Sequence, residues 1–325
     1  MFNYSIRRVL YLIPTLFGIT LVTFLVISLA PGDPVSLQQS GLMNANFSQK
    51  AYDDMRRLYG LDKPLHVRYF IWLDRFVRFD FGNSFSDNRP VTEKIMEKLP
   101  ATLVLNIISM FLTISIAVPA GILSAMKHKS VYDKISGLIF YMLYSLPNFW
   151  LALLLITLLG LKLDLLPIYG IESDQSATLT FFPWLWDRIL HLILPVTCLT
   201  LGGFAYLSRF CRGILLEVIR QDYIRTAWAK GLNKRTVILK HAFRNALIPL
   251  VTLFALMVPL LVSGSVILEY IFNWPGIGQL YFNAIMSRDY PTIMGLSVIS
   301  AILVLISNLL ADLLYALIDP RIMYK

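Results

Sequence analysis

Long runs without a charged side chain are the feature that most restricts the fold of this 325-residue chain. A helix rises about 1.5 Å per residue, so roughly 20 apolar residues are needed to cross about 30 Å of hydrocarbon. Runs of about that length are Val9–Gly32, Pro100–Met126, Ile135–Leu161, Ile189–Ser208, Asn245–Leu268 and Tyr290–Ala311. Each is continuously apolar, whereas the strands of a membrane barrel alternate over about ten residues. The sequence therefore predicts an all-α membrane protein with six transmembrane helices.

Composition agrees, since hydrophobic residues make up 57% of the chain and charged residues 15%, against roughly 45–50% and about 25% in soluble domains. The first run also has features of a signal peptide, because Arg7 and Arg8 precede it and Ser28-Leu29-Ala30 resembles a cleavage site. It is longer than the core of about 7–15 residues in a signal peptide, and Pro31 would directly follow the cut. We therefore expect residues 1–32 to hold an uncleaved first helix, and cleavage is the less favoured alternative.

The distribution of lysine and arginine predicts which side of the membrane each loop faces. With the N-terminus inside, sixteen of the 29 basic residues lie on the inner side, opposed there by Asp133, Glu217, Asp222 and Asp319. Most other charges belong to residues 33–99, a segment long enough to cross regardless of its charge. We expect both termini in the cytoplasm, and we attribute the net charge of +9 to topology rather than to nucleic-acid binding.

The residues that usually carry catalysis or bind metals are scattered. Cys198, Cys211 and the four histidines have no spacing typical of a zinc site or a catalytic cluster, and no Gly-x-x-x-x-Gly-Lys-Ser/Thr sequence for binding ATP occurs. Asp312 is the one carboxylate that we place near the membrane portion of the spans, which argues against a carrier driven by protons or sodium. We expect it to have a structural role, and substrate contact is the less favoured alternative. The chain is therefore expected to be no enzyme and to have no catalytic residue, cofactor or metal. A membrane-embedded enzyme and a passive channel are the alternatives from other classes.

Residues 33–99 form the one sizeable extramembrane segment. Residues 48–60 predict a short helix that Gly60 ends. Residues 64–79 predict a second helix, because apolar residues recur there at three- and four-residue steps. We expect this second helix to lie against the membrane interface or to cap the pore; a small packed cap without ligand contacts is the alternative.

A further external segment follows Glu269. The sequence Trp274-Pro275-Gly276-Ile277-Gly278 turns the chain, because proline removes a donor and glycine permits positive φ. Aromatic residues on either side of the turn suit the headgroup level of a membrane. The functional interpretation is an outer gate formed by Trp274, Pro275, Gly276 and Gly278. The alternative is an aromatic belt on an external turn, and local chemistry does not separate the two.

The loop at residues 209–245 is strongly basic, with nine basic residues against two acidic ones. Within it, Asp222–Gly231 is typical of a short helix, with an acid at its start and a Lys-Gly stop. Ile224, Ala227 and Trp228 recur at helical spacing and would form one apolar side. Charge alone favours a solvated face or contact with anionic lipid over a protein socket.

The detailed pattern of this loop reverses that preference. The core Arg225-Thr226-Ala227-x-x-x-Gly231, followed by Lys240-His-Ala-Phe-Arg-Asn-Ala-Leu-Ile-Pro249, resembles the cytoplasmic EAA loop of binding-protein-dependent ABC import permeases, in the form typical of the dipeptide/oligopeptide/nickel branch. Other stretches that match this branch are Ala30-Pro-Gly-Asp-Pro34, Tyr59-Gly-Leu-Asp-Lys-Pro64, Asp80-Phe-Gly-Asn-Ser84, Arg89-Pro-Val91, Leu99-Pro-Ala-Thr102, Trp274-Pro-Gly-Ile-Gly278, Arg288-Asp-Tyr-Pro291 and Asp312-Leu-Leu-Tyr-Ala-Leu-Ile-Asp-Pro-Arg321. The match covers nearly the whole chain and is nearest to the first of the two permease subunits. The general loop has Glu-Ala-Ala where this chain has Arg225-Thr226-Ala227, so no glutamate role is carried over to Arg225. Pro249 also lies further from Gly231 than in the general loop.

The resemblance implies the fold of a type I ABC importer permease, with an external insertion at residues 33–99. Residues 100–325 would form a five-helix core with spans at about 100–126, 135–161, 189–208, 246–268 and 290–318. The chain would form half of a path for short peptides across the bacterial cytoplasmic membrane, with nickel chelates, glutathione or another small solute as alternatives.

The resemblance also implies the partners. They would be a second permease subunit in a heterodimer, two ATPase subunits, an extracytoplasmic substrate-binding protein and membrane lipid, but no nucleic acid. The residues implied in coupling to the ATPase are Asp222, Tyr223, Arg225, Thr226, Ala227, Lys230 and Gly231. We expect the small residues and the glycine among them to make the contact.

Overall fold

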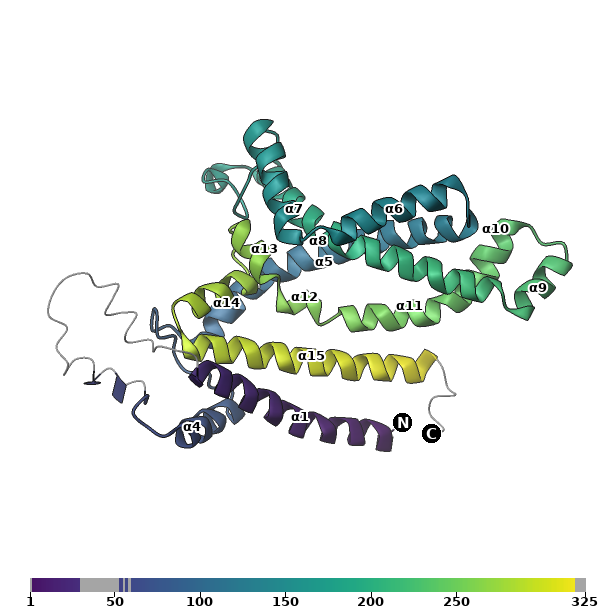
Figure 1. Cartoon of the computed structure of the whole chain (residues 1–325). Coiled ribbons are helices and arrows are strands. Elements are labelled where there is room, and N and C mark those ends of the chain that lie inside the picture. Colours follow the sequence, from purple (N-terminus) through teal and green to yellow (C-terminus); the bar gives the residue numbers. More distant parts are fainter. Residues whose placement is uncertain (1, 30–52, 55, 58–59, 319–325) are drawn as a thin grey trace.

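The fold is all-helical over the residues that the computed structural model describes, which are 2–29, 53–54, 56–57 and 60–318. The first half contains α1 (Phe2–Leu29), α4 (Leu65–Val77), α5 (Val91–Met126), α6 (Val131–Ser145), α7 (Asn148–Leu155) and the π-helix η1 (Ile156–Lys162). The second half contains η2 (Ser176–Thr178), α8 (Phe181–Ile219), α9 (Asp222–Ala229), α10 (Lys234–Thr236), η3 (Val237–Ala242), α11 (Phe243–Met257), α12 (Leu260–Ser263), α13 (Val266–Ile271), α14 (Ile277–Met286) and α15 (Tyr290–Ile318). Figure 1 shows α4 and α14 at one end of the bundle, the α4 end, and α9 and α10 at the other, the α9 end.

Five helical segments are long and apolar enough to cross a membrane, and a bent pair makes a sixth. The five are Leu10–Leu29, Val91–Met126, Phe181–Ile219, Lys234–Ile271 and Tyr290–Leu310, and the bent pair is α6 with α7 and η1. The predicted all-α membrane fold is confirmed. The helix expected at 64–79 is α4, whereas the one expected at 48–60 lies largely outside the described residues.

The span expected near 135–161 is not one straight helix, because the helix breaks before Pro147 and turns by 94°. Leu146 has the extended backbone that a following proline favours, with φ −81° and ψ 124°. Pro147 itself has no N–H to continue the helix. As a result α7 leaves the direction of α6 and rises away from the bundle (Figure 1). Asn148 begins α7 against α8, where a Cβ at Gly202 would lie 2.8 Å from the Asn148 amide.

The run near 246–268 is also interrupted. Helix α11 ends at Met257, and Gly264 takes a φ of +66°, which separates the short α12 from α13. A break in a membrane span frees backbone carbonyls that need other donors. Asn106 on α5 supplies them, because its Nδ2 donates to the carbonyl oxygens of Leu260 and Leu261 at 3.1 and 3.0 Å.

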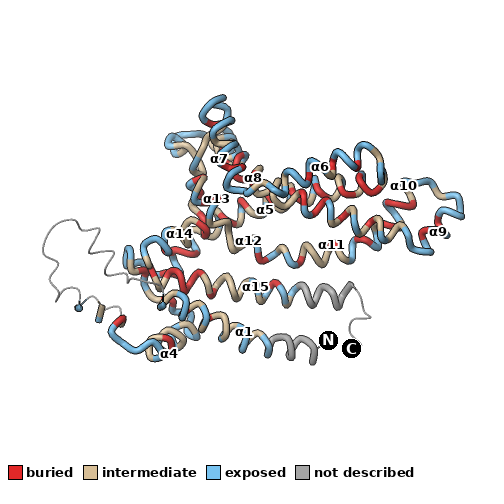
Figure 2. The backbone as a smooth tube through the Cα atoms, viewed as in Figure 1, coloured by how far each residue is buried: buried red, intermediate tan, exposed pale blue. Residues whose placement is uncertain are grey.

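Helices α5 and α8 pack closely through the middle of the bundle. At Gly121 an added Cβ would lie 2.5 Å from the Ser208 carbonyl and 2.8 Å from the Cys211 Cβ, so only glycine permits this approach. Cys198 and Cys211 are buried free thiols within α8. Figure 2 shows buried residues running along the inner sides of the helices, with exposed residues gathered at α4, α7, α9 and α10.

Candidate functional site

The segment around α9 occupies one end of the molecule. Gln221 precedes it with extended backbone, and Asp222 begins the helix, where an acid complements the helix dipole. Lys230 ends it, and Gly231 follows with a φ of +75°. No atom would meet a Cβ placed on Gly231, so the glycine is required for its left-handed backbone and not for space.

One face of α9 belongs to the chain's own core. Ile224 is fully buried and Ala227 is 6% exposed. Both lie in a buried cluster that also includes Leu215 of α8 and Val237 and Ala242 of η3. The side chain of Ala227 therefore supports α9 from beneath, against η3 and α8, and its expected contact with a partner stays a prediction.

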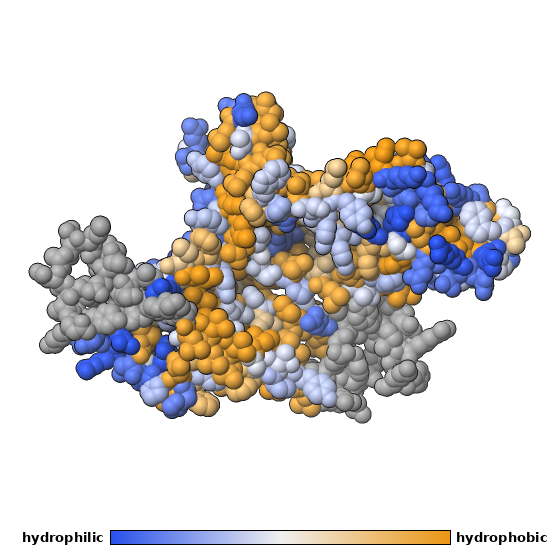
Figure 3. Space-filling view, viewed as in Figure 1, coloured by the Kyte–Doolittle hydropathy of each residue, from blue (hydrophilic) through white to orange (hydrophobic). Residues whose placement is uncertain are grey.

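The remaining sides of α9, which flank this buried stripe and lie opposite to it, are open. Tyr223 is 45% exposed and Trp228 is 41% exposed, and these are large side chains to leave in water. Trp228 was grouped with Ile224 and Ala227 by its spacing, and the structure separates it from them. Arg225 lies 3.7 Å from Asp222, but both side chains are almost wholly exposed, so this ion pair contributes little to stability. Thr226 and Lys230 are also exposed, and Figure 3 shows hydrophilic residues gathered at this end of the molecule.

Short connections tie α9 to the membrane helices. Asn233 caps α10, since its Oδ1 accepts from the Thr236 N–H at 2.8 Å. Nearby, the Arg212 guanidinium on α8 holds the Asp133 carboxylate of α6 with two contacts of 2.7 Å. The α9 end is thus a packed extension of α8 and α11.

The turn Trp274-Pro275-Gly276-Ile277-Gly278 lies at the other end of the bundle and encloses the carboxylate of Glu269. Glu269 is fully buried, and its Oε2 accepts from the Gly278 and Gln279 N–H groups at 2.7 and 3.3 Å. Its Oε1 accepts from the Ser265 N–H at 3.2 Å. Because the first N–H groups of α14 have no partner within the helix, a carboxylate is well suited to this position. The sequence interpretation missed Glu269; an acid bordering an apolar run was the available signal.

Helix α5 completes this arrangement, which we call the Glu269 junction. The Thr102 hydroxyl accepts from the Ile277 N–H at 2.8 Å and donates to Glu269 at 3.3 Å. The indole N–H of Trp274, a residue 1% exposed, donates to the Ala101 carbonyl at 3.0 Å. A Cβ on Gly276 would collide with Glu269 and Thr102, and one on Gly278 would lie 2.8 Å from backbone atoms of Ser265 and Val266. The predicted gate residues therefore meet at a buried junction of α5, α13 and α14 rather than on a loose external turn.

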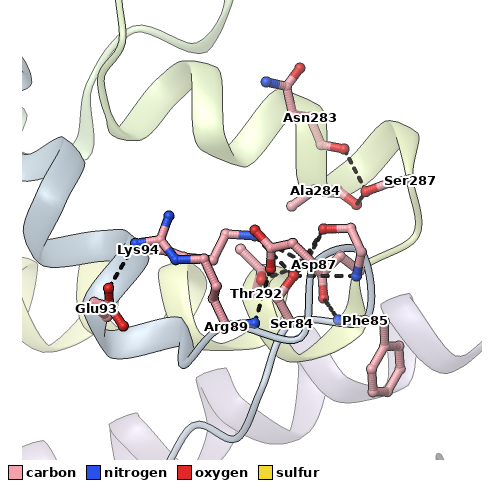
Figure 4. A network of polar contacts seen from close by, with 12 residues as sticks. Ser84, Phe85, Asp87, Arg89, Glu93, Lys94, Asn283, Ala284, Ser287 and Thr292 are labelled. Carbon is pink, nitrogen blue, oxygen red and sulfur yellow. Dashed lines mark hydrogen bonds and ion pairs between the residues drawn. The ribbon is translucent and has the colours of Figure 1, made fainter.

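A second polar junction joins the segment before α5 to the start of α15 (Figure 4). Asp289, which is 1% exposed, accepts from the Ser84 hydroxyl at 2.5 Å and the Thr292 hydroxyl at 2.6 Å. Lys94 on α5 donates to Ser84 and pairs with Asp87, each at 2.9 Å. Burial would raise the pKa of Asp87, but hydrogen bonds from Lys94 and Ser84 outweigh it and lower that pKa.

Metal or cofactor sites would need convergent ligands. Among the residues that the structure describes, no group of three or more His, Cys, Asp or Glu side chains is placed to hold a metal ion. The side chain of Asp312 lies outside the described part.

Known proteins resemble the chain along its whole length. Residues 117–324 match the family described as "Binding-protein-dependent transport system inner membrane component", and residues 1–106 match the N-terminal region of that component. Among curated proteins, the oligopeptide transport system permease protein AppB of Bacillus subtilis is 44% identical over 325 residues, covering 99% of each chain. The dipeptide transport system permease protein DppB of Alkalihalophilus pseudofirmus is 40% identical over 338 residues, covering 100% of each.

A solved structure supports the fold. A chain of the MetNI methionine ABC transporter in an inward facing conformation matches with a TM-score of 0.52 and 18% identity, over 70% of this chain and 97% of that one. The resemblance and the permease fold predicted from the sequence are both confirmed. The chain therefore belongs to the family of binding-protein-dependent ABC importer permeases, as a multi-pass component of the inner membrane.

Proposed function

We propose that this chain passes short peptides through the membrane and is driven by separate ATPase subunits that bind α9. Full-length similarity to permeases named for oligopeptides and dipeptides supports the substrate class. Nickel chelates, glutathione and other small solutes are the alternative substrates, because a separate binding protein would select the solute. Two ATPase subunits, a substrate-binding protein and a second permease subunit complete the proposed transporter.

The two-sided construction of α9 is the observation that carries the coupling role. Ile224 and Ala227 fasten the helix to its own chain, while Tyr223 and Trp228, which lie on either side of that buried stripe, are 45% and 41% exposed. Exposed aromatic side chains are typical anchors of protein interfaces. A partner that binds these side chains and moves them would move α9 together with η3 and α8, because a packed cluster shifts as a rigid body.

The Glu269 junction supports the role of residues 274–278 as the outer gate. It joins the gate segment to α5 through Thr102 and Trp274. Helix α5 also packs along α8, which leads to α9. Motion at α9 would therefore reach the gate through two long helices rather than through flexible loops.

The topology follows from these roles. An ATPase that binds α9 places the α9 end in the cytoplasm. The start of α1 and the end of α15 are directed toward that same side (Figure 1), so both termini would be cytoplasmic. On the membrane helices, apolar side chains such as Phe111 and Tyr141 stay exposed on the single chain, which leaves surface for lipid and for a second permease subunit.

Purification of the complex through this chain tests the proposal. Co-purifying ATPase subunits and a binding protein are expected, and that binding protein should prefer short peptides. Peptide uptake into proteoliposomes should require ATP. Uptake that persists when the ATPase is inactive would indicate a passive channel instead.

A further inference from the structure

A cavity of about 700 Å³ lies at the α4 end, outside the gate and α9. Helix α4 lines it with Arg68, Ile71, Trp72 and Arg75, which are spaced so that they share one helical face. Helix α1 lines it with Phe24, Ile27 and Ser28, and α15 with its first turn. Each of these three helices therefore lines the cavity with side chains from one face.

The charged side chains around the cavity are mostly positive. Arg57, Lys63, Arg68 and Arg75 line it against one carboxylate, Asp80. Within the described part of the chain, none of these four cations pairs with a carboxylate. Arg78 on the same helix behaves differently, because it pairs with Asp74 at 2.9 Å and does not line the cavity.

Arg68 is the least exposed of these cations. Its guanidinium lies 5.9 Å from the centroid of the Phe24 ring, against the wall of α1. Burial lowers the pKa of Arg68 from its usual value. A partly desolvated cation beside other cations is costly, and an anion placed among them would offset that cost.

The same cavity also has an apolar side, to which α1 and α4 both contribute. Phe24 and Ile27 belong to the span Leu10–Leu29, of which little is buried within the chain. On α4, Ile71 also lines the cavity, and its apolar side chain is 39% exposed. Trp72 stacks between Tyr69 and Phe76, an aromatic group suited to the headgroup level. A small soluble anion would gain no binding energy from such an apolar wall, whereas the acyl chains of an amphiphile would.

We propose that this cavity binds an anionic phospholipid, with its phosphate between Arg68 and Arg75 and its acyl chains along α1. The guanidinium groups suit phosphate because each presents several fixed donors. In the proposed topology the lipid comes from the outer leaflet. The bound lipid would fill the space between α1 and α4 and anchor the segment before α5 to the membrane.

Lipid binding to the purified full chain tests this assignment. The probes are phosphatidylglycerol and phosphatidylcholine with the same acyl chains, counted on the protein by native mass spectrometry. Wild-type protein should retain phosphatidylglycerol preferentially. Arg68→Gln with Arg75→Gln should weaken that binding on the order of 25-fold, at about fivefold for each arginine lost near an anionic lipid. Arg78→Gln, on the same helix but outside the cavity, should leave it unchanged.

Equal retention by the double variant would overturn the proposal. Displacement of phosphatidylglycerol by dialanine would also overturn it, because the cavity would then belong to the substrate. A photoactivatable phosphatidylglycerol on wild-type protein keeps the test independent of how the variant folds. It should label peptides containing residues 24–28 and 60–75, and labelling confined to other helices would contradict the assignment.

Discussion

Replacement of Glu269 tests the gate junction most simply. In Glu269→Ala the N–H groups of Ser265, Gly278 and Gln279 lose their acceptor in a buried place. Each unsatisfied donor costs about 1–3 kcal/mol, so the free energy of unfolding should fall on the order of 5 kcal/mol. Glu269→Gln keeps one oxygen and can still serve the α14 N–H groups. The glutamine amide group, a donor, then faces the Ser265 N–H, so the free energy of unfolding should fall by about 2 kcal/mol.

Thermal unfolding of the purified chain measures this series. At roughly 2 °C per kcal/mol for a chain of this size, Glu269→Gln should lower the melting temperature by about 4 °C and Glu269→Ala by about 10 °C. Glu217→Gln, an exposed carboxylate on α8, should leave it within about 1 °C. Melting of Glu269→Ala at the wild-type temperature would refute the junction.

Three further variants separate conformation, packing and polar contacts. Gly231→Ala should cost about 1 kcal/mol through its left-handed backbone and slow ATP-driven uptake, whereas Gly213→Ala, near the end of α8 and with no close neighbour, should be neutral or stabilising. Ala227→Leu should overpack the buried cluster, destabilise the chain purified without any ATPase by about 1–3 kcal/mol and so lower its melting temperature. An effect seen only in the complex would instead favour a partner contact at this residue. Asp289→Asn should speed hydrogen exchange in residues 80–90, which Ser84 otherwise ties to α15, while Asp74→Asn should not; unchanged exchange in both would argue against the second polar junction.

The apolar spans could be predicted from the sequence because the membrane imposes their length directly. The breaks within them could not. Helices α1, α5, α8 and α11 all continue through internal prolines, such as Pro119 and Pro195, whereas the chain breaks at Pro147. The difference depends on neighbours, such as Asn148 against Gly202, that lie far apart in sequence.

In the candidate sites, too, local elements could be predicted from the sequence, whereas contacts made only in the folded chain could not. Local chemistry predicted the helix at α9 and the turn at residues 274–278. It could not assign the faces of α9, because Ala227 and Trp228 are both apolar and only packing against η3 decides between them. Glu269 was missed because its burial depends on Thr102 and the start of α14, which come together only in the folded chain.

Photo-cross-linking from α9 tests the central claim most directly. A photoreactive amino acid at Tyr223 or Trp228, in the assembled transporter, should label an ATPase subunit. The same group at Phe182, which is 80% exposed at the start of α8 near the opposite end, should not. Labelling of the ATPase from Phe182, or none from either position on α9, would contradict the account.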